Sequence, residues 1–454
     1  MATGRAPVSP PMSAPPPRAL RRVVGASFVG TTIEWYDFFI YSTAAALVFG
    51  PQFFPGFSET AGILASFSTF AVGFAARPLG AMVMGHFGDR IGRKSMLVLS
   101  LVTMGVATFL IGCLPTYDTI GVWAPVLLVV LRFLQGFGVG GEWGGASLMA
   151  VEYAPPNRRG LYGAAAPMGT PAGVILSNLV FLGVTAAMPE DAFAAWGWRV
   201  PFLLSAVLVA LGLVIRLKLE ETPVFRRETA RLAPPRAPIV EVLRTHPKQV
   251  GLGAVAFAGN VACGYILIAY VLSYGTAELG LSQSTMLACV LVAASSWLLT
   301  CFVAASWSDR LGRRRVYLFG AYSGLAWVFP LFWLIDTGQP VLVGLSLVVL
   351  TIPLAATFSP MAAMFSELFP TPVRYTGNSL TYQLGAVLGG GLTPLVAVAL
   401  QGATGTTAAV SAYLFAVLLI GLVAIRFIPE TSHRDLEEFA PPRTADATAD
   451  AARA

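Results

Sequence analysis

The sequence predicts an all-α polytopic membrane protein with twelve transmembrane helices in two pseudo-symmetric six-helix bundles. Three observations support this fold class. Apolar residues make up 56% of the 454 residues and charged residues only 11%, whereas about a quarter of the residues in a soluble domain are charged. Twelve apolar stretches are each long enough to cross a hydrocarbon core of about 30 Å. Finally, three landmarks recur in the same order in both halves of the chain, which indicates an internal duplication.

The twelve stretches are bounded by charged residues or by clusters of proline and glycine. The first follows a proline-rich tail that lacks the apolar core of a cleavable signal. We place the spans at 23–49, 59–84, 95–114, 123–151, 160–186, 198–219, 249–275, 284–305, 315–335, 340–368, 374–400 and 406–428. The chain then divides into a disordered cytoplasmic N-terminal tail (1–22), an N-terminal bundle (23–219), a cytoplasmic linker (220–248), a C-terminal bundle (249–428) and a cytoplasmic C-terminal tail (429–454).

Basic residues predict the orientation, because short cytoplasmic loops retain lysine and arginine during insertion. The loops "GDRIGRK", "PPNRRG" and "SDRLGRRR", the linker and both tails all fall on one side of the predicted membrane. We therefore expect a multi-pass protein of the plasma (inner) membrane with both termini in the cytoplasm. Because the net charge of +6 is concentrated in these loops, we expect a lipid bilayer and not a nucleic acid as the partner. The four cysteines show no metal-ligand spacing, so we expect no metal and no cofactor.

The internal repeat covers three pairs of landmarks. "GHFGDRIGRK" after the second span matches "ASWSDRLGRRR" after the eighth, which places Asp89 and Asp309 220 positions apart. "VEYAPPNRRG" after the fourth span matches "SELFPTPVRYTG" after the tenth, and "EETPVF" after the sixth matches "PETSHRD" after the twelfth. Two related bundles with a binding site between them near the membrane midplane are typical of transporters whose halves rock.

Several motifs carry a resemblance to a known family. The motif Asp-Arg-x-Gly-Arg-Arg/Lys, together with "RFLQGFGVGGEWGG" in the fourth span, resembles the major facilitator superfamily. "EWYDFFIY", "GEWGGA", "WRVPF" and "RYTGNSLTYQLGAVLGGGLTP" are similar to its metabolite:proton symporter branch. The resemblance extends from about Arg22 to Thr431 and implies the major facilitator fold.

The resemblance also implies a cytoplasmic gate at the repeated loops. Opposite charges on a tight two-glycine turn form charge-assisted bonds that can break without leaving charge in lipid. Orientation by positive charge alone is the alternative, but it does not require an aspartate. In the second copy Ala305 replaces the first glycine. The expected gate residues are Asp89, Arg90, Arg93, Glu152, Arg159, Asp309, Arg313, Glu367 and Arg374.

Five ionisable side chains fall inside the predicted spans, namely Glu34, Asp37, Arg77, Arg132 and Glu142. At a rise of about 1.5 Å per residue, Arg77 and Glu142 lie about 10 and 14 Å from the same surface, so we predict an ion pair between them. Three acids then face two bases. The remaining carboxylate can take up and release a proton as the occupancy of Arg132 changes, although mutual neutralisation within the bundle is the alternative. We favour Asp37 as the proton carrier, with Glu34 and Glu142 as the other candidates.

Arg132 is the predicted anchor for an anionic substrate, because its planar guanidinium binds a carboxylate through two parallel hydrogen bonds. Tyr41 follows Asp37 by one turn and Gln135 follows Arg132 by three residues, so both can share one face. Polar residues at midpoints of helices in the second half can complete the site, namely Asn260, Tyr265, Tyr382 and Gln383. Packing and interhelical hydrogen bonding are the alternative role for each of these polar residues.

These features predict a secondary active transporter that takes up a small organic acid, such as a mono- or dicarboxylate, by proton-coupled symport as a monomer. An osmolyte symporter for betaine or proline is the alternative, although the short C-terminal tail has no heptads for the coiled coil that osmosensing relatives carry. A drug/proton antiporter is less well supported, because the fifth span lacks the Gly-Pro-x-x-Gly-Gly run. The sequence shows neither a nucleophile with an adjacent base nor a metal cluster, so these patterns do not indicate an enzyme.

Overall fold

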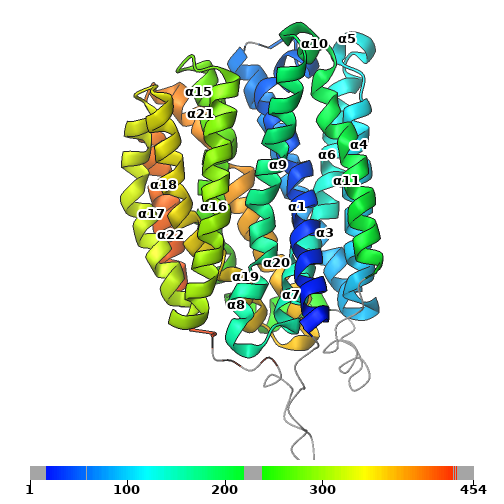
Figure 1. Ribbon diagram of the computed structural model, residues 1–454, viewed down its shortest axis with the longest axis vertical. Coiled ribbons are helices and arrows are strands. Elements are labelled where there is room, and N and C mark those ends of the chain that lie inside the picture. The colour runs from blue at the N-terminus through cyan, green and yellow to red at the C-terminus, as the bar shows by residue number, and fades with distance from the viewer. Residues whose placement is uncertain (1–16, 58, 219–237, 433, 435, 437–454) are drawn as a thin grey trace, which may run out of the picture.

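The computed structural model describes residues 17–57, 59–218, 238–432, 434 and 436. These residues form helices and short connections, with no strand among them. Figure 1 shows two groups of long helices side by side, which we call the N-half (17–218) and the C-half (238–432). The start of α1 and the end of α22 lie at one end of the bundle, which we call the tail end, and α5 and α10 lie at the opposite far end.

The N-half contains the first six spans. Its fourth, fifth and sixth spans are each built from consecutive helical pieces, because glycine and proline interrupt them. The helices are α1 (Pro17–Leu47), α2 (Phe49–Phe53), α3 (Glu59–Ile91), α4 (Arg93–Cys113), α5 (Tyr117–Ile120), α6 (Trp123–Val139), α7 (Glu142–Tyr153), η1 (Pro156–Arg158), α8 (Arg159–Gly163), α9 (Ala165–Ala187), α10 (Glu190–Ala195), η2 (Gly197–Arg199) and α11 (Val200–Leu217).

The C-half contains the last six spans and begins with a short amphipathic helix, α13. Its helices are α13 (Pro238–Thr245), α14 (Pro247–Tyr265), η3 (Ile266–Tyr270), α15 (Val271–Ala277), α16 (Gln283–Leu311), α17 (Arg313–Ile335), α18 (Pro340–Phe358), α19 (Met361–Leu368), η4 (Thr371–Val373), α20 (Arg374–Ala386), η5 (Val387–Gly391), α21 (Thr393–Thr404) and α22 (Ala408–Arg426). The segments η3 and η5 are π turns.

The long helices agree with the predicted twelve spans. Eleven stretches in the described residues are long and apolar enough to cross a membrane. The remaining span is α1, which has 31 residues but carries Glu34 and Asp37 near its middle, and these two acids lower its mean hydropathy. The fold is therefore all-α, with two six-helix bundles.

The repeated charged motif is not an extended loop. α3 continues through the motif to Ile91, α4 begins at Arg93, and Gly92 alone connects them with a φ of 112°. Gly312 connects α16 to α17 in the same way with a φ of 100°. Only glycine adopts such a φ without steric cost, so the predicted two-glycine turn is corrected to a single-residue link at each copy.

The two halves meet most closely at the tail end. Here α20 of the C-half packs against α3 and α7 of the N-half, and α16 packs against α8 and α9. At the far end a pocket of about 400 Å³ opens between the halves, lined by Gln52 and Glu190 of the N-half and Gln283 of the C-half among others. The halves are thus joined at the tail end and parted at the far end.

Candidate functional site

The predicted ion pair between Arg77 and Glu142 is wrong. Both oxygens of Glu142 are taken by Arg216 of α11, which forms a close ion pair with Oε1 and donates from Nη1 to Oε2 at 2.7 Å. Ser100 of α4 donates to the same carboxylate at 3.0 Å. Arg216 Nη1 also donates to the Leu97 carbonyl at 2.5 Å, so the guanidinium beside Glu142 is that of Arg216 and not that of Arg77.

Arg216 also changes the charge count. It is 3% exposed and lies inside the predicted span 198–219, so three acids face three bases and not two. The sequence contained this signal, because Arg216 is only three residues from the predicted end of that span. The remaining question is how Glu34, Asp37, Arg77 and Arg132 are arranged.

Arg77 and Arg132 lie against one cluster of aromatic rings. The Arg77 guanidinium carbon is 4.3 Å from the ring centre of Phe38, and that of Arg132 is 4.2 Å from the same ring. Arg77 also lies over Phe74 and Trp35, at 4.4 and 5.6 Å. Cation–π contacts of this kind stabilise a buried guanidinium without using its hydrogen-bond donors. Consistently, none of the three guanidinium nitrogens of Arg77 has a hydrogen-bond partner in the described part of the chain.

Arg132 takes part in a hydrogen-bond network that reaches α1. Its Nη1 donates to Gln135 Oε1, and Gln135 Nε2 donates to Thr108 Oγ1 at 2.8 Å and to the backbone carbonyl of Asp37 at 3.2 Å. The Arg132 guanidinium also lies 4.0 Å from the ring centre of Tyr41. The structure therefore brings the predicted residues Arg132, Gln135 and Tyr41 together beside α1.

Asp37 is buried without a hydrogen-bond donor for its carboxyl oxygens. The residue is 0% exposed, and neither oxygen has a partner among the residues that the structure describes. Glu34, one turn earlier, is 1% exposed and lies within electrostatic range of Arg77 and Arg216. An ionised carboxylate that lacks both donors and a paired cation is costly in a protein interior. Asp37 is therefore the acid whose surroundings best suit a bound proton.

A narrow cavity of about 30 Å³ lies between the two halves. The N-half contributes Trp35, Phe39 and Thr170, and the C-half contributes the rest of the wall. Three of the predicted substrate residues line it, namely Asn260, Tyr265 and Tyr382. The π turns help to shape this region, because Ile268 of η3 lines the cavity and Ala386, which also lines it, immediately precedes η5.

The other predicted substrate residues lie elsewhere. Tyr41 hydrogen-bonds to Thr69 at 2.5 Å, within the N-half. Gln383 donates to the carbonyls of Val139 and Gly140 at 3.2 and 3.0 Å, so it joins the halves on the tail-end side of the cavity. Tyr41, Gln135, Gln383 and Arg132 are not among the residues that line the cavity.

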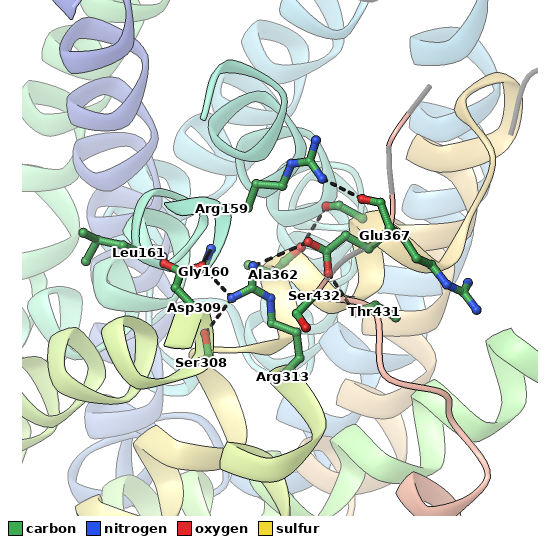
Figure 2. Close-up of polar contacts among 12 residues, drawn as sticks. Arg159, Gly160, Leu161, Ser308, Asp309, Arg313, Ala362, Glu367, Thr431 and Ser432 are labelled. Atoms are coloured by element: carbon green, nitrogen blue, oxygen red, sulfur yellow. Dashed lines mark hydrogen bonds and ion pairs between the residues drawn. The ribbon is translucent and has the colours of Figure 1, made fainter. Parts of the chain in front are cut away.

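At the tail end, Asp309 joins α16 of the C-half to α8 of the N-half (Figure 2). Its carboxylate accepts the backbone N–H groups of Gly160 and Leu161, each at 2.8 Å. Arg313 donates to Asp309 at 2.7 Å and pairs with Glu367 of α19 at 3.5 Å. The predicted gate residues Asp309, Arg313 and Glu367 therefore form one network.

A second connection between the halves involves α20. Arg374 at its start pairs with Glu152 of α7 at 3.5 Å. The Tyr375 hydroxyl donates to the Gly141 carbonyl at 2.6 Å, and Asn378 donates to Ser147 at 3.2 Å. For Asp89, Arg90 and Arg93, three further predicted gate residues, the side chains lie outside the described part of the structure.

The residues that follow α22 extend this network, which sequence reasoning missed. We call the described residues of 429–436 the C-terminal strap. Thr431 donates to Glu367 at 2.7 Å, and the carbonyls of Arg434 and Leu436 accept from Arg159 and Arg374, each at 2.8 Å. The strap therefore contacts both halves.

Glu430 of the strap fixes the start of α17. Its carboxylate accepts the backbone N–H groups of Arg313 and Arg314 at 2.9 and 3.1 Å. Burial opposes ionisation of this group, but the N–H donors of Ser432, Arg313, Arg314 and Thr431 outweigh burial and lower the pKa of Glu430 below its ordinary value. The only sequence signal was the repeated "PETSHRD" landmark, whose role the spacing did not reveal.

The sequence matches a known protein family and two transport proteins of Escherichia coli. The family model of the Major Facilitator Superfamily matches residues 27–394. The chain is 41% identical to the inner membrane metabolite transport protein YhjE of Escherichia coli, over 93% of this chain and 97% of that protein. It is also 41% identical to the shikimate transporter of Escherichia coli, over 84% and 88% of the two chains.

A further relative and a solved structure are also similar to this chain. A transporter of glycine betaine, proline, ectoine and pipecolic acid, OusA of Dickeya dadantii, is 35% identical over 93% of this chain and 86% of that protein. Among solved structures, the proton:xylose symporter XylE bound to 6-bromo-6-deoxy-D-glucose superposes with a TM-score of 0.77 and 17% identity, over 93% and 98% of the two chains. That likeness concerns the fold.

Proposed function

Since this chain belongs to the Major Facilitator Superfamily, we propose that it takes up a small organic acid together with a proton by alternating access. It is a multi-pass transporter of small molecules in the inner membrane and not an enzyme. The proposal concerns the cargo, the coupling ion and the residues that carry them. The coupling ion is a proton, with no further cofactor, and the monomer is the working unit.

The buried, donor-free carboxyl of Asp37 is the observation that carries proton coupling. It is 0% exposed, and its backbone carbonyl accepts from Gln135, which in turn accepts from Arg132. Arrival of a negative charge near Arg77 and Arg132 changes the field at Asp37 and so the ease with which it holds a proton. Glu34, in range of Arg77 and Arg216, is the second candidate, whereas Glu142 is already paired.

The closed tail end supports a gate in the proposed transport cycle. Retention of basic residues in cytoplasmic loops assigns the tail end to the cytoplasm, with both termini there. We therefore propose that this conformation faces outward and that Asp309, Arg313, Glu367, Glu152 and Arg374 hold the cytoplasmic side shut. Asp89, Arg90 and Arg93 take equivalent places in the repeat, and we propose the same task for them.

A betaine or proline symporter is the second candidate function. Seven of the cavity-lining residues are aromatic, namely Trp35, Phe39, Phe257, Tyr265, Trp297, Phe358 and Tyr382. Aromatic cages bind quaternary ammonium groups through cation–π attraction, and the relative OusA is named for such substrates.

One experiment separates these functions. Purified protein in proteoliposomes is tested for accumulation of labelled mono-, di- and tricarboxylates and of glycine betaine, with an inward proton gradient and with an uncoupler. The proposal expects a carboxylic acid to accumulate above equilibrium and the accumulation to collapse with the uncoupler. Accumulation of betaine alone would establish the second candidate, and accumulation that depends on sodium and not on protons would refute proton coupling.

A further inference from the structure

We propose that the cargo is a hydroxylated monocarboxylate, whose carboxylate binds Arg77 and whose hydroxylated body occupies the cavity between the halves. This inference rests on the proposed function, because it names the chemical class of the acid and its place in that site. It differs from the sequence-based expectation, which assigned the carboxylate to Arg132.

Arg77 is a buried cation that lies beside the Tyr265 hydroxyl and within electrostatic range of Glu34. Its side chain is part of a residue that is 1% exposed, and Nε, Nη1 and Nη2 have no hydrogen-bond partner in the described residues. A buried donor without an acceptor is costly, and the cost is greater when the donor belongs to a charged group. A carboxylate satisfies two such donors at once through the planar fork.

Arg77 contacts a ring that lines the cavity, whereas the rings that Arg132 lies over do not line it. The Arg77 guanidinium contacts Trp35, which lines the cavity, and its neighbours Phe38 and Phe74 pack against Tyr265, another lining residue. The rings around Arg132 are Phe38, Tyr41 and Phe70, and none of them lines the cavity. One Arg132 nitrogen is also used by Gln135. The geometry therefore favours Arg77 as the carboxylate anchor.

The cavity wall carries unused polar atoms of neutral residues. Four lining residues each have a buried polar atom without a hydrogen-bond partner in the described chain: Trp35 Nε1, Thr170 Oγ1, Tyr265 Oη and Trp297 Nε1. All four residues are 5% exposed or less. Buried polar groups are normally paired, so a group of four unpaired ones around one cavity indicates a ligand with several neutral oxygens.

The same wall disfavours the other cargo classes. None of the lining residues is charged, so a second carboxylate would be buried there without a partner, at high cost. A trimethylammonium group would suit the aromatic rings but could not accept hydrogen bonds from the two indole N–H groups. A hydroxylated ring presents apolar C–H faces to the aromatic rings and oxygens to the four polar atoms.

The cavity of about 30 Å³ is too small for such a cargo in this conformation, since a volume of about 10 to 15 Å³ on the same scale already holds one water molecule. The halves must therefore separate further, from the far end as far as this cavity, to admit the substrate. Closure around it would then bring residues of both halves onto one molecule, which is how binding energy is converted into rocking.

A matched pair of ligands tests the proposal. Shikimate and cyclohex-1-ene-1-carboxylate share a ring and a carboxylate, but only shikimate carries hydroxyl groups. Binding to the purified full-length protein is measured by titration calorimetry and by competition with labelled shikimate in proteoliposomes. We expect shikimate to bind at least tenfold more tightly than the deoxygenated acid, and both to bind at least tenfold more tightly than succinate or glycine betaine.

Matched variants then locate the contacts. Tyr265→Phe and Thr170→Val each remove a hydroxyl and keep the shape, so each should lower the shikimate preference severalfold, because each weakens shikimate more than the deoxygenated acid. Arg77→Lys should weaken both acids at least tenfold, whereas Arg132→Lys, the control at the neighbouring guanidinium, should weaken them much less. Tryptophan fluorescence and a monodisperse elution profile establish that each variant is folded.

The outcomes separate this inference from the proposed function. Tighter binding of succinate, or an unchanged preference in both hydroxyl variants, overturns the hydroxylated monocarboxylate while uptake of an organic acid still stands. A larger loss for Arg132→Lys than for Arg77→Lys returns the carboxylate to Arg132. If no acid binds or accumulates and only glycine betaine does, the proposed function itself fails.

Discussion

Glu142 of α7 and Arg216 of α11 form a buried ion pair inside the N-half, with side chains 0% and 4% exposed. The pair joins the fourth span to the sixth, and Ser100 of α4 adds a third helix to it. Because Arg216 neutralises Glu142, Arg77 is not paired with Glu142, and Glu34 is the acid that lies within electrostatic range of Arg77. Of the charges predicted inside the spans, Glu34, Asp37, Arg77 and Arg132 therefore remain outside this ion pair.

The Glu142–Arg216 pair should be important for stability. Glu142→Ala leaves the Arg216 charge buried without its partner, which should destabilise the protein by about 3 to 5 kcal/mol. The double variant Glu142→Leu/Arg216→Met should recover most of this loss. Thermal unfolding followed by tryptophan fluorescence in detergent measures both, with Glu190→Ala, at an exposed far-end position, as control. Equal midpoints for Glu142→Ala and the control would contradict a stabilising role.

Asp37→Asn should abolish accumulation against a gradient, because asparagine cannot carry the proton. Exchange of external for preloaded substrate should persist, since exchange does not require proton release. Both activities are measured in the same proteoliposomes. Glu34→Gln is the matched comparison one turn away and should retain part of the accumulation. Full accumulation in Asp37→Asn would assign coupling to Glu34 instead.

Arg132→Lys should disturb the position of α1 more than it changes the affinity for the substrate. Lysine cannot donate to Gln135 and still cover the rings of Phe38 and Tyr41, so the support of α1 at Asp37 is loosened. We expect a lower maximal uptake rate and an altered dependence of uptake on pH, with the substrate dissociation constant changed less than threefold. A measured loss of affinity with an unchanged pH profile would make Arg132 a substrate ligand.

Asp309→Asn should weaken closure of the tail end. Asparagine removes the charge that accepts from two backbone N–H groups of α8 and from Arg313. In a cysteine-free background, Ala362→Cys, which is buried at this end, should then react severalfold faster with a membrane-impermeant maleimide applied from the tail side. Asp118→Asn, at an exposed position of the far end, should leave that rate unchanged. The same rate in both variants would argue against the latch.

The stabilisation of the folded state by Glu430 should decrease at acid pH. Burial opposes ionisation of Glu430, but its backbone N–H donors lower its pKa below the ordinary 4.5. A carboxyl of this kind stabilises the folded state above its unfolded pKa, and the contribution is lost as the pH falls through the folded pKa. The contribution should therefore be constant near neutrality and decline only below about pH 4.5.

Glu430→Gln provides the measurement. The difference in thermal midpoint between the natural protein and this variant should be largest at neutral pH and shrink below about pH 4.5. Glu278→Gln, at an exposed position of the far end, should show no such convergence. A difference that stays constant down to about pH 3 would contradict the assignment.

The sequence predicted the fold well because its signals are local. Each span is a run of apolar residues, and the repeat of Asp89 and Asp309 is visible in the chain itself. Only the ends were misjudged, since α3 and α16 continue through the charged motifs to single glycines. A charged residue at a helix end does not stop the helix when the carboxylate or guanidinium can reach water or a partner.

The site was harder to predict, because partner choice depends on rotation and tilt of helices. Depth alone matched Arg77 to Glu142, but Arg216 approaches Glu142 from another helix at the same depth. The unpaired indole of Trp297 could not be recognised either, since a tryptophan in an apolar run normally indicates packing. The π turns η3 and η5 likewise have no simple sequence signature.

The C-terminal strap has a consequence for biogenesis. The ribosome synthesises residues 429–436 after all twelve helices, yet these residues bind Arg159 of the N-half and Arg374 of the C-half. A newly inserted chain therefore passes through a stage in which its helices are in the bilayer but its closing segment has not yet docked. Docking of this segment onto Arg159 and Arg374 is therefore the last contact between the halves to form at the tail end.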